Sequence, residues 1–179
     1  MAQNFAGRVV LITGAGRGLG RATAERFLER GAQVAVNVRT PERAETLAQE
    51  LGRNSHPAPG DIRSAAAVRA LVADIVQRFG RLDILVNNAA IASATRIEQL
   101  TEDEWRATID TNLTAAFLCI QAVVPAMKSQ SHGRIINVSS LAGRSVSTLG
   151  GAHYTASKAG MLGLDARRGK RTWRARHHG

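Results

Sequence analysis

Cysteine, proline and aromatic residues are scarce in this sequence, which has one cysteine, Cys119, four prolines and only 4% aromatic residues. A single cysteine cannot form a disulfide within the chain, which argues against a small disulfide-held extracellular protein and favours a cytoplasmic location. We expect Cys119 to be a core residue. No apolar run approaches the roughly 20 residues that span a bilayer, and no basic leader precedes a long apolar segment. The sequence therefore predicts neither a membrane anchor nor a signal peptide.

The positive charge of the chain is unevenly distributed. The net charge is +10, but residues 165–179 hold six basic residues and one acidic residue, so this short segment carries +5 and residues 1–164 carry the other +5. The body of the chain is therefore only mildly basic, which suits an anionic cofactor or an acidic partner. A basic arm that binds nucleic acid is an alternative interpretation of residues 165–179.

Short apolar, β-branched segments alternate with helical patterns along most of the 179 residues, 44% of which are hydrophobic. This alternation predicts an α/β fold, a doubly wound parallel sheet of the Rossmann-like three-layer αβα type. Residues 1–164 form one domain. Strands are predicted at 8–13, 33–38, 82–88 and 133–140, with a further strand ending near residue 60, and helices at 19–30, 41–51, 64–79 and from 101 to about 125.

A glycine-rich turn, TGAGRGLG at residues 13–20, follows the first predicted strand. Gly14 permits a tight exit from the strand, Gly18 lets backbone approach a pyrophosphate, and Gly20 allows close packing of the helix on the strand. The amino end of the helix supplies N–H donors and positive potential. The turn predicts a dinucleotide site, although such turns also end strands without any ligand.

The segment Asn37-Val38-Arg39-Thr40, at the end of the second predicted strand, indicates which dinucleotide binds. A carboxylate here would accept the ribose hydroxyls of NAD but repel a 2′-phosphate, and no acid occurs before Glu42. Arg39 would pair with the phosphate, with Arg17 nearby in the turn. We predict a preference for NADP(H). The alternative is that both arginines are solvated surface charges.

Two more loops are predicted at the cofactor end. Asp61 follows the stretch HPAPG and could accept a hydrogen bond from an adenine amine or cap the helix that begins near Ser64. Small residues in NNAA, residues 87–90, let a flat ring and its ribose lie on the backbone, and an asparagine side chain there can tie neighbouring loops together. The alternative for residues 87–90 is a simple turn.

Tyr154 and Lys158, in YTASK, lie one helical turn apart on one face. Hydride transfer to a carbonyl requires a proton, and a nearby ammonium can move a phenol with a free pKa of roughly 10 toward usable acidity. Ser139 and Ser140 follow the strand predicted at 133–140, where ligands of open α/β sheets bind. Strand alternation lets only one serine point into the site. No metal site is predicted.

The order and spacing of six motifs carry a resemblance to a known family: TGAGRGLG, Asp61, NNAA, Asn112 in TNLT, INVSS and YTASK. From Arg8 to about Leu164 the sequence resembles the short-chain dehydrogenase/reductase family. One departure is Ala90, where the family usually has glycine. The resemblance implies that Tyr154 is the general acid or base and that Lys158 holds the nicotinamide ribose. It also implies that Ser140 hydrogen-bonds the substrate carbonyl, with Ser139 as the alternative. Asn112 would support a water-linked proton path. The cofactor contacts it implies are Gly14, Arg17, Gly18, Leu19, Gly20, Arg39, Asp61, Ile62, Asn88, Ala89, Tyr154 and Lys158.

The motif set looks like that of bacterial-type 3-oxoacyl-[acyl-carrier-protein] reductases. The resemblance therefore implies an NAD(P)-dependent oxidoreductase, with reduction of a 3-oxoacyl thioester carried on an acidic carrier protein as the first expectation. Sugar, steroid and small-ketone substrates remain alternatives. Full-length relatives are expected to be homo-oligomers.

After Leu164 the resemblance ends, because the family continues with an amphipathic helix and further strands whereas this sequence has DARRGKRTWRARHHG. We expect residues 165–179 to be an unstructured basic tail produced by truncation or a frameshift, which the coding DNA would test. The strand at 133–140 would then be an exposed apolar edge. A catalytically silent nucleotide-binding fragment, or an unstable product, is the alternative to an active enzyme.

Overall fold

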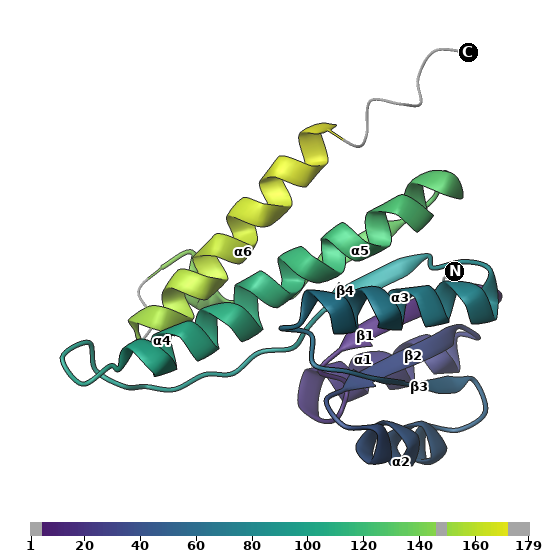
Figure 1. Cartoon of the computed structure of the whole chain (residues 1–179), viewed down its shortest axis with the longest axis horizontal. Helices are drawn as coiled ribbons and strands as arrows, with labels where there is room; N and C mark the ends of the chain where they lie inside the picture. Colours follow the sequence, from purple (N-terminus) through teal and green to yellow (C-terminus); the bar gives the residue numbers. More distant parts are fainter. Residues whose placement is uncertain (1–4, 146–149, 172–179) are drawn as a thin grey trace.

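The computed structural model describes residues 5–145 and 150–171, with side chains described as far as residue 164. Five parallel strands form one sheet in the order β3-β2-β1-β4-β5, with helices packed on both faces, so the predicted three-layer α/β fold is confirmed (Figure 1). The strands are β1 (Val9–Thr13), β2 (Gln33–Val38), β3 (Ser55–Pro59), β4 (Ile84–Asn87) and β5 (Arg134–Asn137).

Local sequence signals set the starts of several helices. Pro41 occupies the first turn of its helix behind the cap residue Thr40, and the Ser64 hydroxyl accepts from the Ala67 amide. The helices are α1 (Gly18–Glu29), α2 (Pro41–Leu51), α3 (Ala65–Phe79), α4 (Glu102–Ile109), α5 (Ala115–Ser129) and α6 (Ala152–Arg171), with a π-helical turn η1 (Asp110–Thr114) and a 3-10 turn η2 (Leu141–Gly143).

The central strand β1 is buried on both faces, as its apolar sequence predicts. Val9 and Leu11 pack into one core with α3 and α5, whereas Val10 and Ile12 pack into the other core with α1 and α2. Cys119 on α5 is 2% exposed within the first core, which confirms it as a core residue. Because both faces of the central strand are covered, a site is expected at the loops that follow the carboxyl ends of the strands.

The helix predicted from residue 101 to about 125 differs from the prediction in two ways. It continues to Ser129 with Pro125 inside it, and η1 interrupts it at residues 110–114. Pro125 removes one backbone N–H, but it is exposed, and its neighbours Val123 and Met127 are buried in the core and hold the helix in place. Tertiary packing therefore overrides the local helix-breaking signal.

The helical run Glu102–Ser129 is long and apolar enough, by length and composition alone, to cross a membrane. Its buried residues, which include Cys119, Ile120 and Val123, pack against α3 and the sheet. This packing is that of a core helix, and core helices can also be long and apolar enough to meet these criteria.

The segment 165–179, predicted to be an unstructured basic tail, is helical in its first part. Helix α6 runs to Arg171, so the segment 165–171 is helical rather than unstructured. Alanine, arginine and lysine are strong helix formers, and they make up most of this segment, so an established helix can continue through it. Residues 172–179, the remainder of the predicted basic tail, lie outside the described residues.

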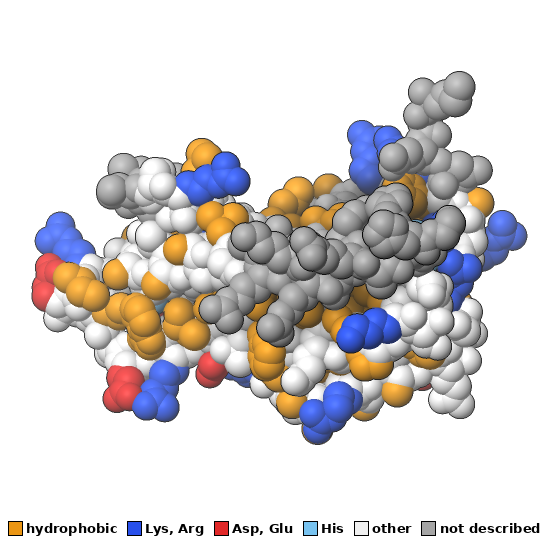
Figure 2. All heavy atoms as spheres, turned by 90° about the horizontal axis from the view of Figure 1, so that it is seen from above, with side chains coloured by type: hydrophobic (Ala, Val, Ile, Leu, Met, Phe, Trp, Pro, Cys, Tyr) orange, Lys and Arg blue, Asp and Glu red, His pale blue; other side chains and the backbone are white. Residues whose placement is uncertain are grey.

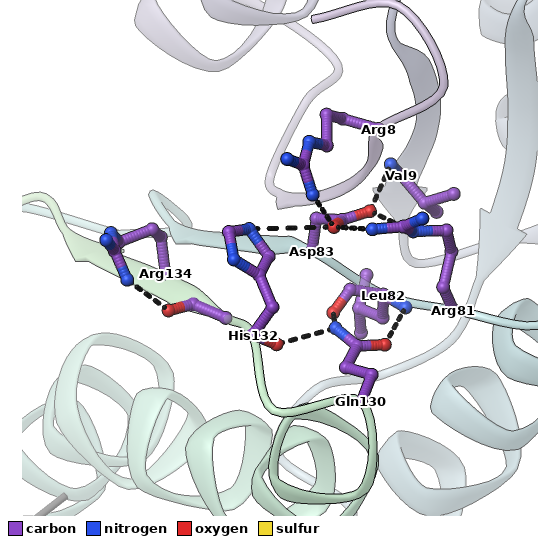
Figure 3. Close-up of polar contacts among 9 residues, drawn as sticks. Arg8, Val9, Arg81, Leu82, Asp83, Gln130, His132 and Arg134 are labelled. Atoms are coloured by element: carbon purple, nitrogen blue, oxygen red, sulfur yellow. Dashed lines mark hydrogen bonds and ion pairs between the residues drawn. The ribbon is translucent and has the colours of Figure 1, made fainter. Parts of the chain in front are cut away.

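A cluster around Asp83 ties together the amino ends of the strands (Figure 3). The Asp83 side chain is fully buried, and it accepts hydrogen bonds from Arg8 (2.8 Å), from Arg81 (2.5 and 2.7 Å) and from the Val9 amide (3.0 Å). His132 Nε2 lies 3.7 Å from the same carboxylate. This cluster fixes the edge of the sheet opposite the loops that carry the predicted site.

Strand β5 lies at the edge of the sheet that the structure describes, and Ile136 on it is 46% exposed, so the predicted exposed apolar edge is observed. Lys and Arg side chains outnumber acidic ones on the face shown in Figure 2. That excess agrees with the mild positive charge of the body of the chain.

Candidate active site

A cleft of about 860 Å³ lies at the carboxyl ends of the strands, where the loops that follow β1, β2, β3 and β4 meet. Ligands of open α/β sheets bind at this edge. The residues predicted from the turn and loops to contact a cofactor all line the cleft: Gly14, Arg17, Gly18, Leu19, Gly20, Arg39, Asp61, Ile62, Asn88 and Ala89. Tyr154 and Lys158, also predicted to contact it, are not among the lining residues.

Two glycines of the turn, Gly14 and Gly18, have different surroundings. Gly14 has φ +64°, and a Cβ there would lie 2.7 Å from the Ala89 Cα, so this glycine allows β1 and the β4 loop to approach closely. Gly18 has φ +53° and would meet nothing within 4 Å, so its surface is open to the cleft at the amino end of α1. A phosphate can therefore approach the backbone N–H groups of this turn.

Asn88 ties the loop after β4 to the loop after β1. Its side-chain amide donates to the carbonyl oxygens of Thr13 (3.0 Å) and Gly14 (3.1 Å). The Thr13 hydroxyl in turn accepts from the backbone amides of Asn88 (3.0 Å) and Ala89 (3.2 Å). An asparagine that links the loops was predicted from the sequence, whereas the hydrogen bonds of Thr13 were not.

Four arginines and one carboxylate line the cleft and give it a net positive charge. Arg43 and Arg63 line it together with the predicted Arg17 and Arg39, and Asp61 is its only acidic lining residue. Hydrogen bonds from Arg63 lower the pKa of Asp61 to about 2. The Asp61 carboxylate accepts from the Arg63 guanidinium at 2.6–3.1 Å, whereas Ser64 caps α3, so the alternative that Asp61 caps this helix is wrong.

Tyr154 and Lys158 occupy neighbouring turns of α6. The Lys158 ammonium lies 5.9 Å from the centroid of the Tyr154 ring and donates a hydrogen bond to the Val138 carbonyl at 2.8 Å. Lys158 is 2% exposed, and burial lowers the pKa of its ammonium. Because Val138 directly follows β5, the pair lies at the same edge of the sheet as the glycine turn.

The two candidate serines point to different partners. The Ser139 hydroxyl donates to the Lys158 carbonyl at 2.8 Å, so its proton is used in holding α6. The Ser140 hydroxyl accepts from the Ala142 amide at 3.2 Å, and an acceptor role leaves the hydroxyl proton available to donate.

Asn112 lies in the π-helical turn rather than in regular helix, and it is fully buried. Its side chain accepts from the Ile91 amide (2.8 Å) and donates to the Ile91 carbonyl (2.9 Å) and to the Ser157 hydroxyl (3.1 Å). Asn112 thus joins the loop after β4 to α6. Thr111 beside it lines the cleft, so this turn lies between the cleft and the Tyr154 helix.

The single cysteine, Cys119, is not a reactive group, and the described residues form no metal site. Burial raises the pKa of the Cys119 thiol to about 12, which makes a nucleophilic thiolate unavailable near neutral pH. Within the described residues, no group of three or more His, Cys, Asp or Glu side chains could hold a metal ion.

Comparison with known proteins gives consistent matches. Residues 8–171 match the family model described as short chain dehydrogenase. The chain is 42% identical over 158 residues to a 3-oxoacyl-acyl-carrier-protein reductase of Staphylococcus aureus and 38% identical over 161 residues to that of Escherichia coli. It is also 42% identical over 163 residues to a hydroxy(phenyl)methylsuccinyl-CoA dehydrogenase subunit of Thauera aromatica.

A solved structure agrees with the fold. The crystal structure of a short-chain alcohol dehydrogenase from Sinorhizobium meliloti superposes with a TM-score of 0.83 at 35% sequence identity, covering 90% of this chain and 65% of that one. The alignments with the Staphylococcus and Escherichia reductases cover 86% and 90% of this chain, and 64% and 66% of the relatives. The chain thus spans about two thirds of the length of the curated relatives it matches.

Proposed function

The chain belongs to the short-chain dehydrogenase family, and we propose that it is an oxidoreductase that transfers a hydride between NADP(H) and a carbonyl or alcohol substrate. The observation that carries this proposal is the Tyr154–Lys158 pair at the carboxyl end of β5, on the same sheet edge as the glycine-lined cleft. A proton donor and a dinucleotide site at one edge are what carbonyl reduction requires.

The residues of the cleft fit a dinucleotide. Gly18 leaves open space in front of backbone N–H groups at the amino end of α1, which suits the pyrophosphate. Asp61 and Ile62 follow β3 and would border the adenine, while Asn88 and Ala89 follow β4 and would border the ribose on the nicotinamide side. The nicotinamide, when bound, supplies or accepts the hydride.

A preference for NADP(H) over NAD(H) follows from the charges of the cleft. Arg39 directly follows β2, where NAD-preferring sites carry a carboxylate, and Arg17 and Arg43 line the same region. The single carboxylate of the lining, on Asp61, is already paired with Arg63. A 2′-phosphate would meet a guanidinium at Arg39 and no unpaired acid among the lining residues.

Each predicted catalytic residue has a proposed task. Tyr154 donates the proton to the nascent alkoxide in reduction and removes it in oxidation, and Lys158 stabilises the phenolate and holds the nicotinamide ribose. Ser140, whose hydroxyl proton is available, donates to the substrate carbonyl. The side chain of Asn112 is bonded to Ile91 and Ser157, and a water-linked proton path from Asn112 to Lys158 stays a prediction.

The substrate class that we propose first is a 3-oxoacyl thioester. Support comes from the names of the Staphylococcus and Escherichia relatives, which are 3-oxoacyl-acyl-carrier-protein reductases. We expect such a carrier protein to be acidic, and the net positive charge of this chain suits an acidic partner. A cytoplasmic location belongs to the same proposal, whereas homo-oligomers are expected of the full-length relatives. Sugars, steroids and small ketones are the alternative substrates.

The first experiment is a thermal unfolding measurement of the 179-residue chain alone, with NADPH and with NADH. A cooperative transition that NADPH raises more than NADH supports the cofactor assignment. NADPH oxidation is then followed against a panel of ketones and 3-oxoacyl thioesters, with Tyr154→Phe as the inactive control. Nucleotide-dependent stabilisation without turnover would favour the silent nucleotide-binding alternative, and a chain with no cooperative transition would contradict both.

A further inference from the structure

A second polar cluster lies beside the proposed proton donor. His153 is 0% exposed, and its Nε2 lies 2.8 Å from the Ser93 hydroxyl. The hydroxyls of Ser93 and Thr95 both donate to the same carboxylate oxygen of Glu104, at 2.5 and 2.6 Å. The cluster therefore joins α6, the loop after β4 and α4. None of these four residues lines the cleft described above.

Counting protons assigns the direction of each hydrogen bond. The hydrogen bonds from Ser93 and Thr95 lower the pKa of Glu104, so this side chain is a carboxylate and can only accept. Ser93 has one hydroxyl proton, which it donates to Glu104. The Ser93 oxygen must then accept from His153, and the proton of His153 is assigned to Nε2. The chain of donors runs from His153 through Ser93 to Glu104.

This order is not that of a hydrolytic triad. In a serine hydrolase the histidine accepts from the serine and the carboxylate bonds the far nitrogen of the histidine. Here the carboxylate bonds the serine, and His153 Nδ1 is buried with no hydrogen-bond partner in the part of the chain that the structure describes. Ser93 is held as a donor to Glu104 and is not activated as a nucleophile.

The cluster is connected to Tyr154 through the backbone of α6. His153 immediately precedes Tyr154, and the Gly151 amide donates to the Ser93 carbonyl at 2.8 Å. One turn further on, the Ser157 hydroxyl donates to the Tyr154 carbonyl (2.7 Å) and accepts from Asn112. His153 and Ser157 are both fully buried. The turn that carries Tyr154 is therefore anchored on both sides, by His153 to the loop after β4 and by Ser157 to η1.

The His153 ring also fills a space that only glycine leaves free. A Cβ on Gly151 would lie 2.6 Å from the ring Cε1 and 2.8 Å from the Thr95 carbonyl oxygen. The loop after β4 therefore packs against the start of α6 with the imidazole between them. A rigid contact of this kind restricts where the phenol of Tyr154 can lie.

We propose that His153 is a positioning residue for the reaction, which holds Tyr154 in register with the cofactor cleft by donating through Ser93 to Glu104. The inference rests on the proposed function, since a fixed phenol matters only to a proton transfer. An error of about 1 Å in the position of a reacting group can cost about 100-fold in rate.

The test uses the full chain and two substitutions at one position. His153→Leu keeps a side chain of similar length but removes the donor, while His153→Gln keeps an N–H donor at about the reach of Nε2. Tyr154 is the only tyrosine of the sequence, so a chain labelled with fluorotyrosine gives a single fluorine resonance that reports on its surroundings. Glu102→Gln, an exposed substitution on the same helix as Glu104, is the matched control.

The expected result is a moved or broadened tyrosine resonance in His153→Leu and a fall in kcat of about 100-fold, with the KM for NADPH unchanged. His153→Gln recovers the wild-type resonance and most of kcat, and Glu102→Gln changes neither. A His153→Leu chain with the wild-type resonance and the wild-type kcat overturns the inference. So does a His153→Gln chain as impaired as His153→Leu, because the donor would then not be the property that matters.

The resonance separates this inference from the proposed function. If the unmodified chain turns over no substrate, the function fails while the resonance still shows whether His153 positions Tyr154. If His153→Leu does not fold, Ser93→Ala removes the acceptor with a smaller change of volume and is expected to move the resonance in the same way. An unmoved resonance in a folded Ser93→Ala chain then overturns the inference.

Discussion

The side-chain amide of Asn88 occupies the space in which Gly20 would carry a Cβ. That atom would lie closer than 3.0 Å both to the amide nitrogen of Asn88 and to the Gly14 carbonyl oxygen. The same amide bonds the carbonyls of Thr13 and Gly14, so the absence of a side chain at Gly20 is what allows the loops after β1 and β4 to be joined.

Substitutions of Gly20 and Gly18 should therefore affect stability and NADPH affinity in different proportions. Gly20→Ala forces the Asn88 amide away and should lower the free energy of unfolding by about 1–3 kcal/mol. Gly18→Ala meets no atom within 4 Å and should cost only about 1–2 kcal/mol for its positive φ, while its methyl group blocks the open face of the turn. Urea unfolding and NADPH titration check both variants. Equal losses of NADPH affinity and stability in the two would contradict this division.

Arg39→Ala should weaken NADPH binding and leave NADH binding nearly unchanged. A hydrogen-bonded charge pair with the 2′-phosphate contributes about 1.5–3 kcal/mol, which corresponds to about 10- to 150-fold in affinity. Fluorescence titration with each nucleotide measures the effect. Arg26→Ala, which removes an exposed arginine of α1 paired with Glu29, is the control. A loss shared equally by NADPH and NADH would mean that Arg39 is a solvated charge.

Asp83→Asn should destabilise the fold and change its response to acid. Burial alone would raise the pKa of Asp83, but hydrogen bonds from Arg81, from the Val9 amide and from Arg8 hold it below its usual value of 3.8. Because the folded pKa is depressed, the stabilisation is present above about pH 4 and is lost as pH falls through the folded pKa.

Urea unfolding at neutral pH should show a loss of about 1–3 kcal/mol for this substitution, since a buried acceptor of three donors is replaced. Below pH 4 the difference from the unmodified chain should shrink. Asp74→Asn, at an exposed position of α3, should change little at any pH. A difference that persists unchanged into acid would show that the charge of Asp83 is not the stabilising feature.

Lys158→Met should abolish hydride transfer without a comparable loss of stability. Burial lowers the pKa of Lys158, so the folded chain pays a desolvation cost to keep this ammonium, and methionine has no charge to desolvate. The lost hydrogen bond to Val138 offsets part of that gain, so the free energy of unfolding should change by about 1 kcal/mol or less. Turnover should fall by about 100-fold or more. A strongly destabilised variant would make Lys158 a structural residue first.

Local signals in the sequence predicted much of the fold because their effects act over a few residues. Strand β2 was predicted with the bounds that it has, and Pro41 and Ser64 lie at the helix starts where their backbone chemistry favours them. The end of α5 was predicted wrongly at Pro125, because the core residues against which Val123 and Met127 pack come from distant parts of the chain.

The residues of the cleft also divide into those that local sequence signals predicted and those that only the packing of helices places there. The glycine turn, Arg39, Asp61 and Asn88 were found from the sequence because each begins within two residues of the end of a strand. The carboxyl ends of parallel strands meet at one edge of the sheet. Arg43 and Arg63 were missed, since they lie inside or before helices and reach the cleft only through the way α2 and α3 pack. Their positions two to four residues beyond Arg39 and Asp61 were the signal available.

The sequence by itself determined the order of strands and helices, the glycine turn and the one-turn spacing of Tyr154 and Lys158, because these depend on backbone preferences and helical periodicity. Only the tertiary structure decided that the carboxylate of Asp83 pairs with Arg8, 75 residues away in the sequence, and that His153 Nε2 lies 2.8 Å from the Ser93 hydroxyl. Such pairs depend on how a sheet and its helices bring distant segments within 3 Å of one another, and no local pattern records that distance.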